Sequence, residues 1–88
     1  MISESTINKV RELSIEDVLE PYVRLSRKGS TLMGICPFHE ERTGSFSVSP
    51  GKNLFHCFSC NRGGDAITFI MEKENLSFME AIAFLARR

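Results

Sequence analysis

The chain has 88 residues, of which 42% are hydrophobic and 25% are charged, and this length allows one small domain. No apolar run approaches the ~20 residues of a membrane helix, so we expect no membrane association. The N-terminus lacks the basic start and apolar stretch of a secretion signal, which predicts a cytoplasmic protein. A core of this size is marginal in stability, and small domains often rely on disulfides or a bound metal.

The charges balance to a net charge of zero but are unevenly distributed. Residues 1–20 carry two basic and five acidic side chains, which gives a net charge of −3. Residues 21–64 carry six basic and two acidic side chains (+4), and residues 65–88 carry three and four (−1). A basic segment of this kind indicates a polyanionic partner.

The N-terminal segment is predicted to be helical over residues 5–20. Apolar residues recur at a helical stride in residues 5–13. The sequence from Ser14 to Asp17 resembles a capping box that begins a second helical turn, and Pro21 ends it.

Residues 22–62 are predicted to form antiparallel strands joined by two metal knuckles. Residues 22–25 and 31–35 flank a turn signal at 27–30, which indicates a hairpin with a basic tip. Residues 45–49 alternate between polar and apolar side chains, and residues 54–58 return after a turn.

Two helices are predicted to follow, over residues 66–74 and 78–87. Asp65 is a suitable N-cap for the first helix, and Ser77 and Glu80 form a capping box for the second. The expected fold class is therefore α+β, a small zinc ribbon flanked by short N-terminal and C-terminal helices within a single domain, 1–88.

Four residues form two pairs with metal-ligand spacing. Cys36 and His39 are a C-x-x-H pair, and Cys57 and Cys60 are a C-x-x-C pair. A tight turn aims both ligands of each pair at one ion, and a hairpin brings the pairs together into the tetrahedral Cys₃His shell that zinc prefers. Four protein ligands leave no open coordination position, so we expect one structural zinc ion.

Three alternatives stand beside this ligand set. The cysteines could be buried free thiols, or they could hold an iron–sulfur cluster, which more often uses four cysteines. His56 adjoins Cys57 and competes with His39 for the fourth position. Since neighbouring residues of a strand point to opposite faces, we expect His56 to point outward as a solvent-exposed residue or a nucleic-acid contact.

The residues around these ligands resemble the zinc-binding motif of bacterial replicative DNA primases and their phage and plasmid relatives. The resemblance is carried by residues 36–48 and 55–67, together with 17–23, 69–72 and 76–81, and so covers nearly the whole chain. Gly44 replaces a usual proline and Ser59 a usual glycine. These departures favour a primase of a phage, plasmid or other mobile element and leave zinc binding intact.

The resemblance implies an N-terminal zinc-binding domain of a DNA primase, which makes short RNA primers for replication. In that family the domain helps to recognise single-stranded template. Primer synthesis takes place in a separate domain with acidic Mg²⁺ ligands, so this chain is expected to be a non-catalytic fragment of a longer enzyme. The implied partners are single-stranded DNA, the catalytic domain of the same or a neighbouring chain, and a replicative helicase.

Single-strand binding requires a basic track and exposed aromatic side chains. The candidates for these contacts are Arg27, Lys28, Arg42, Lys52 and Arg62, with Phe46, Phe55 and Phe58 as candidates for base stacking. Phe38 and Phe58 lie inside the knuckles and are expected to shield the zinc ion. The competing interpretation is that the charges form a solvated face and the phenylalanines form the core.

Two other functions compete with template binding. The ribbon could make only protein contacts, to a helicase or to another primase domain. A stand-alone enzyme is disfavoured, because no acid–base or nucleophile set remains once the metal ligands are assigned.

Overall fold

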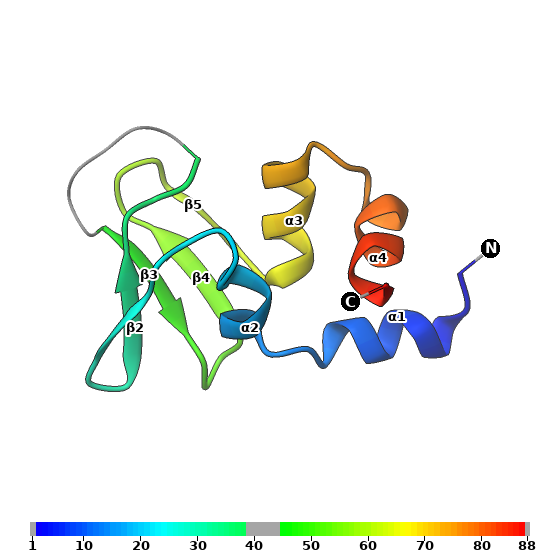
Figure 1. Cartoon of the computed structure of the whole chain (residues 1–88), viewed down its shortest axis with the longest axis horizontal. Coiled ribbons are helices and arrows are strands. Elements are labelled where there is room, and N and C mark those ends of the chain that lie inside the picture. The colour runs from blue at the N-terminus through cyan, green and yellow to red at the C-terminus, as the bar shows by residue number, and fades with distance from the viewer. Residues whose placement is uncertain (1, 39–44, 88) are drawn as a thin grey trace.

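The protein combines one antiparallel sheet with helices at both ends of the chain (Figure 1). The computed structural model describes residues 2–38 and 45–87. Within these residues the elements are α1 (Glu4–Arg11), α2 (Ile15–Leu19), β1 (Ser26–Lys28), β2 (Thr31–Gly34), β3 (Phe46–Ser49), β4 (Leu54–Cys57), β5 (Arg62–Gly64), α3 (Ala66–Glu74) and α4 (Phe78–Ala86). The five strands follow the order β1-β2-β3-β4-β5, and every neighbouring pair is antiparallel. The predicted α+β class is confirmed.

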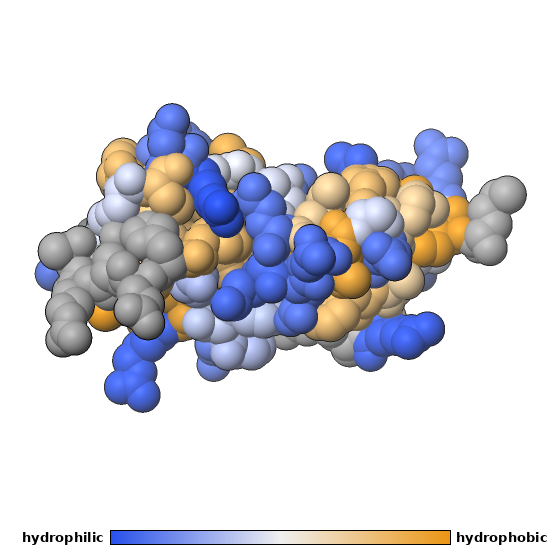
Figure 2. All heavy atoms as spheres, turned by 90° about the horizontal axis from the view of Figure 1, so that it is seen from above, coloured by the Kyte–Doolittle hydropathy of each residue, from blue (hydrophilic) through white to orange (hydrophobic). Residues whose placement is uncertain are grey.

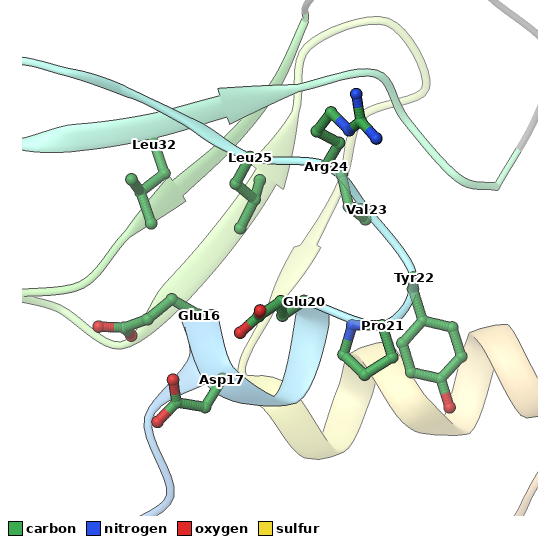
Figure 3. Close-up of a pocket in the computed structure, with 9 residues that line it drawn as sticks. All are labelled: Glu16, Asp17, Glu20, Pro21, Tyr22, Val23, Arg24, Leu25 and Leu32. Carbon is green, nitrogen blue, oxygen red and sulfur yellow. The ribbon is translucent and has the colours of Figure 1, made fainter.

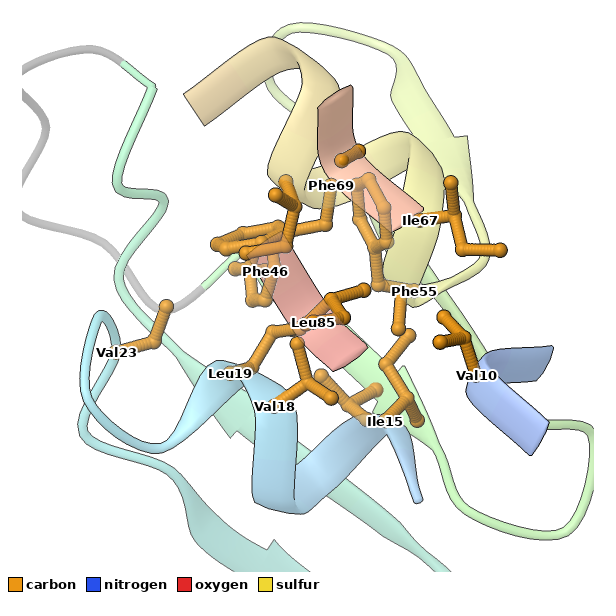
Figure 4. Packing of buried hydrophobic residues seen from close by; sticks show 14 of the residues in the cluster. Val10, Ile15, Val18, Leu19, Val23, Phe46, Phe55, Ile67, Phe69 and Leu85 are labelled. Carbon is orange, nitrogen blue, oxygen red and sulfur yellow. The ribbon is translucent and has the colours of Figure 1, made fainter. Parts of the chain in front are cut away.

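The hydrophobic core lies between one face of the sheet and the helices (Figure 4). Alternation along the strands points Phe46 and Phe55 toward this side. The two rings stack with centroids 5.5 Å apart, and Phe69 of α3 meets the Phe55 ring edge-on at 5.5 Å. Ile15 and Leu19 of α2 are fully buried in the same cluster. Burial of each such side chain contributes about 1.5–3 kcal/mol, so this face holds the helices on the sheet.

The last two helices begin as the sequence predicts. The Asp65 side chain accepts a hydrogen bond from the backbone N–H of Thr68 at 2.8 Å. Ser77 and Glu80 form the predicted capping box at the start of α4. These caps satisfy N–H groups that have no partner within the helix.

The predicted capping box at the start of α2 is wrong. Ser14 is the N-cap residue, but its side chain makes no capping hydrogen bond. Instead, Asn53 from the β3–β4 turn accepts from the Ile15 N–H at 2.8 Å through Oδ1 and donates to the Leu13 carbonyl at 3.0 Å through Nδ2. A residue almost forty positions away therefore caps α2 and fixes it to the sheet.

The predicted hairpin is displaced along the chain. Residues 22–25 are irregular, because the N–H groups of Tyr22 and Val23 both bond to the Leu19 carbonyl and close the end of α2. The first strand is therefore Ser26–Lys28, which the sequence placed partly in the turn. The chain reverses after Lys28, where Gly29 adopts a positive φ of 64°.

A further strand, β5, lies beyond the strands that the sequence predicted. Gly63 pairs with His56, and Gly64 pairs with Phe55. A Cβ on Gly63 would lie 3.0 Å from both the His56 side chain and the Phe55 carbonyl oxygen. Glycine is therefore the residue that allows this edge strand to approach β4 so closely.

Candidate metal centre and nucleic-acid interface

The structure brings the three cysteines together at one end of the sheet. Cys36 follows β2, Cys57 ends β4, and Cys60 lies in the β4–β5 turn. Their Sγ atoms all lie within 4.8 Å of one another, and Cys36 and Cys60 are separated by 3.7 Å between Sγ atoms. Zinc with bonds of about 2.3 Å to sulfur places tetrahedral ligands about 3.8 Å apart. The sulfur cluster therefore has the dimensions of a zinc site.

Backbone N–H groups of both turns point at these sulfurs. The Phe38 N–H faces Cys36, and the N–H groups of Ser59 and Cys60 face Cys57. Burial raises the pKa of Cys36 to about 12. Burial also opposes ionisation of Cys57, but the Cys60 N–H and the Cys36 thiol outweigh it and lower the pKa of Cys57 to about 6. A bound divalent cation would favour the thiolate forms of these cysteines, which are the forms that bind metal.

The residues around the sulfur cluster connect it to the core and to the helices. Phe38, from the first knuckle, packs against Phe55 at 6.1 Å and Phe69 at 5.2 Å between ring centroids. The guanidinium of Arg62 lies over the Phe38 ring, 4.9 Å from its centroid. Lys73 of α3 donates to the Pro37 carbonyl at 3.2 Å. The knuckle is thus fixed both to the core and to the helices.

Two of the predicted site residues, His39 and Arg42, lie outside the described residues. The three cysteines that the structure does place offer three sulfur ligands, and the predicted histidine would follow Cys36 in the same knuckle. The cysteine cluster therefore fits zinc, while the identity of the fourth ligand stays a prediction.

Two of the aromatic residues predicted to stack on bases are not available for it. Phe46 is fully buried and Phe55 is 3% exposed, because both point into the core (Figure 4). The correction extends to Phe58, which was expected to shield the zinc ion but is 68% exposed. Its ring meets the His56 ring edge-on, with centroids 4.7 Å apart. Of the three candidates for base stacking, Phe58 is therefore the one whose ring is exposed.

The side of the sheet opposite the core has a different composition. The strand register places Met33, Ser47, His56 and Gly63 in one row across β2 to β5. Ser26 extends this row on β1, and alternation puts further residues on the same side. We call this surface the open face; its residues are Ser26, Lys28, Thr31, Met33, Ser47, Ser49, Leu54, His56 and Gly63. Its residues are half-buried or exposed, and four of the nine carry a hydroxyl group.

The predicted basic track divides between the two sides of the sheet. Lys28 belongs to the open face. Arg27 pairs with Leu32, which packs on the core, so it points to the opposite side. Arg62 pairs with Cys57 and lies over Phe38, on the core side as well. Lys52 is exposed in the β3–β4 turn, at the end of the sheet away from the cysteines.

A second basic residue, Arg24, lies near Lys28, although the sequence pattern did not indicate it as a site residue. Arg24 and Lys28 line a surface hollow of about 950 Å³ together with Met33 and Ile35. Ile35 is 51% exposed and leads into Cys36. Because residues 22–25 were expected to form a regular strand, nothing in the sequence distinguished Arg24 from any other strand charge.

A second hollow, on the other side of the hairpin, is acidic (Figure 3). It measures about 520 Å³ and lies between α2 and the β1–β2 hairpin. Glu16, Asp17 and Glu20 of the α2 region line one side, and Leu25 and Leu32 line the other. Arg24 lines both hollows, but three acidic side chains outnumber it in this one. A polyanion would therefore be repelled here, whereas the first hollow carries only the basic side chains of Arg24 and Lys28.

The helical end of the molecule also exposes hydrophobic side chains. Figure 2 shows hydrophobic residues gathered over this end and hydrophilic residues across the middle of the molecule. Met79 and Phe84 of α4 are 43% and 38% exposed. Among the described residues, no helix has the length and apolar character needed to cross a membrane.

Comparison with known proteins agrees with this geometry. Residues 2–88 match the model of the CHC2 zinc finger family. The chain is 50% identical over 88 residues to a DNA primase of Geobacillus stearothermophilus, covering 99% of this chain and 15% of that protein. It is 47% identical to a DNA primase of Helicobacter pylori, covering 100% of this chain and 16% of that protein. The chain therefore spans about 15% of the length of the curated relatives it matches.

A solved structure shares the whole fold. The crystal structure of the Aquifex aeolicus primase, comprising zinc-binding and RNA polymerase domains, superposes with a TM-score of 0.88 and 45% sequence identity. The match covers 100% of this chain and 22% of the Aquifex chain.

Proposed function

Because this chain belongs to the CHC2 zinc finger family, as the resemblance implied, we propose that it is the template-binding module of a DNA primase and that its open face contacts single-stranded DNA. The observation that carries this proposal is the exposed Phe58 ring beside His56. Bases of any sequence stack on such rings, and each stacked base contributes about 1–3 kcal/mol.

The charge distribution also supports DNA binding by the open face. Lys28 and Arg24 line the hollow beside the open face, where they are placed to contact phosphates. The acidic hollow lies behind the hairpin, so repulsion from Glu16, Asp17 and Glu20 favours approach from the open face. Hydroxyls of Ser26, Ser47 and Ser49 add neutral hydrogen-bonding groups for the sugar–phosphate backbone.

Zinc has a structural role in this proposal. We infer that His39 completes the shell of Cys36, Cys57 and Cys60. The ion would fix the end of β4 and the β4–β5 turn, which carry His56, Phe58 and Asn61. Four protein ligands would leave no coordination position for substrate.

The relatives of this chain also suggest a function for the whole protein. We propose that the chain is part of a cytoplasmic primase whose separate catalytic domain, with Mg²⁺, makes RNA primers. The module would present template to that domain, in the same or a neighbouring chain.

The experiment that tests DNA binding uses the zinc-loaded chain and a fluorescently labelled single-stranded 12-mer. Anisotropy is measured over a series of salt concentrations. We expect Kd to increase with salt concentration. A plot of log Kd against the logarithm of the salt concentration should be linear, with a slope of about 0.7 for each phosphate contact. Absent or salt-independent binding would contradict a direct template role.

A second candidate function is docking of another protein through α4, which would include a primase domain or a replicative helicase. Exposed Met79 and Phe84 favour it, together with a hollow of about 280 Å³ beside Phe84, Tyr22 and Ile70. Pull-down of the purified catalytic domain by this chain and by its Phe84→Ser variant tests it. Equal capture by both proteins, or capture by neither, would rule out this surface.

A further inference from the structure

We propose that Ser30, at the tip of the β1–β2 hairpin, is a phosphorylation site whose modification weakens the binding of single-stranded DNA. The partner is a serine kinase that recognises basic side chains before its target, and the phosphate donor is ATP. The effect on DNA rests on the proposed function of the open face, whereas the acceptance of phosphate by Ser30 does not.

The hairpin tip is a two-residue loop that exposes Ser30 to solvent. Lys28 pairs with Thr31 across the hairpin, so Gly29 and Ser30 make the loop. Gly29 takes the first position with a φ of 64°, which glycine adopts without strain. Ser30 is exposed, whereas Thr31 is half-buried and its hydroxyl donates to the Lys28 carbonyl at 3.1 Å. Ser30 is therefore the hydroxyl of this tip that an enzyme can reach.

Two basic side chains come immediately before the loop. Arg27 and Lys28 stand three and two positions before Ser30, and the strand that carries them is exposed along its length. Kinases select their substrates by complementary charge patterns, so basic residues before a serine fit a kinase whose substrate groove is acidic. Because β1 is an edge strand of three residues, local opening lets this segment extend into such a groove at a low cost in free energy.

Arg27 is also placed to stabilise the phosphorylated tip. Its side chain reaches the loop, where Nη1 donates to the Gly29 carbonyl oxygen at 3.5 Å. That carbonyl belongs to the peptide bond preceding Ser30, so a phosphate on Ser30 would lie within reach of the guanidinium. Guanidinium and phosphate groups form strong charge-assisted hydrogen bonds. DNA contacts on the open face give Arg27 no role, because it points to the opposite side of β1, and phosphorylation supplies one.

The reaction is a phosphoryl transfer from ATP to the hydroxyl of Ser30. The Oγ atom attacks the γ-phosphorus, the bond from that phosphorus to the β–γ bridging oxygen breaks, ADP leaves, and the hydroxyl proton passes to the carboxylate base of the kinase. The new group carries a charge of about −1.5 to −2 at neutral pH. Lys28 flanks the loop on the open face, so this phosphate competes with the phosphates of DNA for its ammonium group.

The test of the site uses the zinc-loaded chain, ATP and the catalytic subunit of a cyclic-AMP-dependent protein kinase, which selects serines preceded by basic residues. Mass spectrometry counts and locates the phosphate. We expect one phosphate on Ser30 and none on the loop of Ser30→Ala. Transfer to Arg27→Ala should be about tenfold slower, since one charge-assisted contact to the kinase is lost. Ser26→Ala, which removes another exposed hydroxyl of the same hairpin, is the matched control and should accept phosphate at the wild-type rate.

The effect on DNA is measured on the purified phosphorylated chain with the labelled single-stranded 12-mer. We expect weaker binding and a salt slope reduced by about 0.7, which is the loss of one phosphate contact. Chain incubated with the kinase without ATP is the control, and zinc content and circular dichroism establish that every protein is folded.

Phosphate absent from Ser30, or added equally fast to Arg27→Ala, would overturn the site. Unchanged affinity and slope after phosphorylation would overturn the effect on DNA. Failure of the unmodified chain to bind DNA would overturn both the proposed function and the effect on DNA, while the site on Ser30 stands or falls on the phosphate count.

Discussion

The two sides of the sheet use neighbouring residues of the same strands for opposite purposes. On β4, Phe55 and Cys57 point into the core and toward the sulfur cluster, while His56 between them lies on the open face. On β3, Phe46 and Val48 are fully buried, while Ser47 between them pairs with His56. The covered side is therefore built for stability, and the open face carries the chemistry that remains available to a partner.

This contrast shows that an aromatic residue in a ribbon cannot be assigned a role from its type alone. Phe46, Phe55 and Phe58 lie within thirteen positions of one another, yet only Phe58 is exposed. Phe58 follows the last residue of β4, where the chain turns to bring Cys60 back to the cluster. Substitutions on each side should therefore affect different measurements.

The largest effect should come from Cys57→Ser, which removes a ligand that both sides depend on. Structural zinc in small domains contributes an apparent free energy of about 10–16 kcal/mol, so we expect loss of zinc and of the folded state. Zinc content and circular dichroism measure this. Phe58→Ala, one residue away and exposed, is the control and should keep its zinc. A folded Cys57→Ser variant would contradict the structural role of the ion.

Phe46→Ala should destabilise the covered side by about 3–5 kcal/mol, because it leaves a cavity among Phe55, Phe69 and the helices. Urea denaturation of the zinc-loaded protein measures the free energy of unfolding. Under conditions where the variant is folded, its affinity for single-stranded DNA should equal that of the wild type. Weakened DNA binding by the folded variant would break the distinction between the two sides.

Asn53→Gly should lower the free energy of unfolding by about 1–3 kcal/mol, since it leaves the Ile15 N–H and the Leu13 carbonyl without their partner. Glycine accommodates the positive φ of 58° at this position, so the loss reports on the side chain. Lys52→Gly, in the same turn, serves as the comparison and should have a smaller effect. Equal losses in the two variants would show that Asn53 is not what fixes α2 to the sheet.

Phe58→Ala should weaken binding of single-stranded DNA by about 1–3 kcal/mol, with little change in stability. Fluorescence anisotropy and urea denaturation together separate the two effects. A large loss of stability with unchanged affinity would assign Phe58 to the core and contradict its role as a stacking surface beside the open face.

The smallest expected effect is a difference in the salt dependence of DNA binding between two variants, Lys28→Ala and Arg27→Ala. The two residues are adjacent and exposed but point to opposite sides of β1. Removing one phosphate contact should reduce the salt slope by about 0.7 for Lys28→Ala and leave it unchanged for Arg27→Ala. Equal slopes in the two variants would mean that the side of the strand does not decide contact with DNA.

The sequence predicted the architecture because its strongest signals are local. The spacing of Cys36, Cys57 and Cys60 requires two tight turns, and Asp65 and Ser77 mark the starts of helices within a few residues. Long-range contacts were less accessible. The Asn53 cap on α2 joins two segments that nothing in the sequence connects, and β5 forms only because Gly63 allows close approach to β4.

The functional surface was harder to predict than the fold. Alternation showed that Phe46 and Val48 share a face, but it did not reveal which face the helices cover. Because β1 spans Ser26–Lys28, Arg27 and Lys28 point to opposite sides of the sheet. Arg24 precedes the strand and lines the hollow beside Lys28. These assignments depend on register, which the sequence of a single chain determines only weakly.

The most direct test of the account is a map of where DNA touches the molecule. Backbone amide NMR signals of the zinc-loaded chain can be followed as a single-stranded 12-mer is added. We predict that the largest shifts occur at Lys28, Ser47, His56 and Phe58, with little change in α2. Shifts concentrated around Glu16 to Glu20, or on α4, would contradict the claim that the open face of the sheet receives the template.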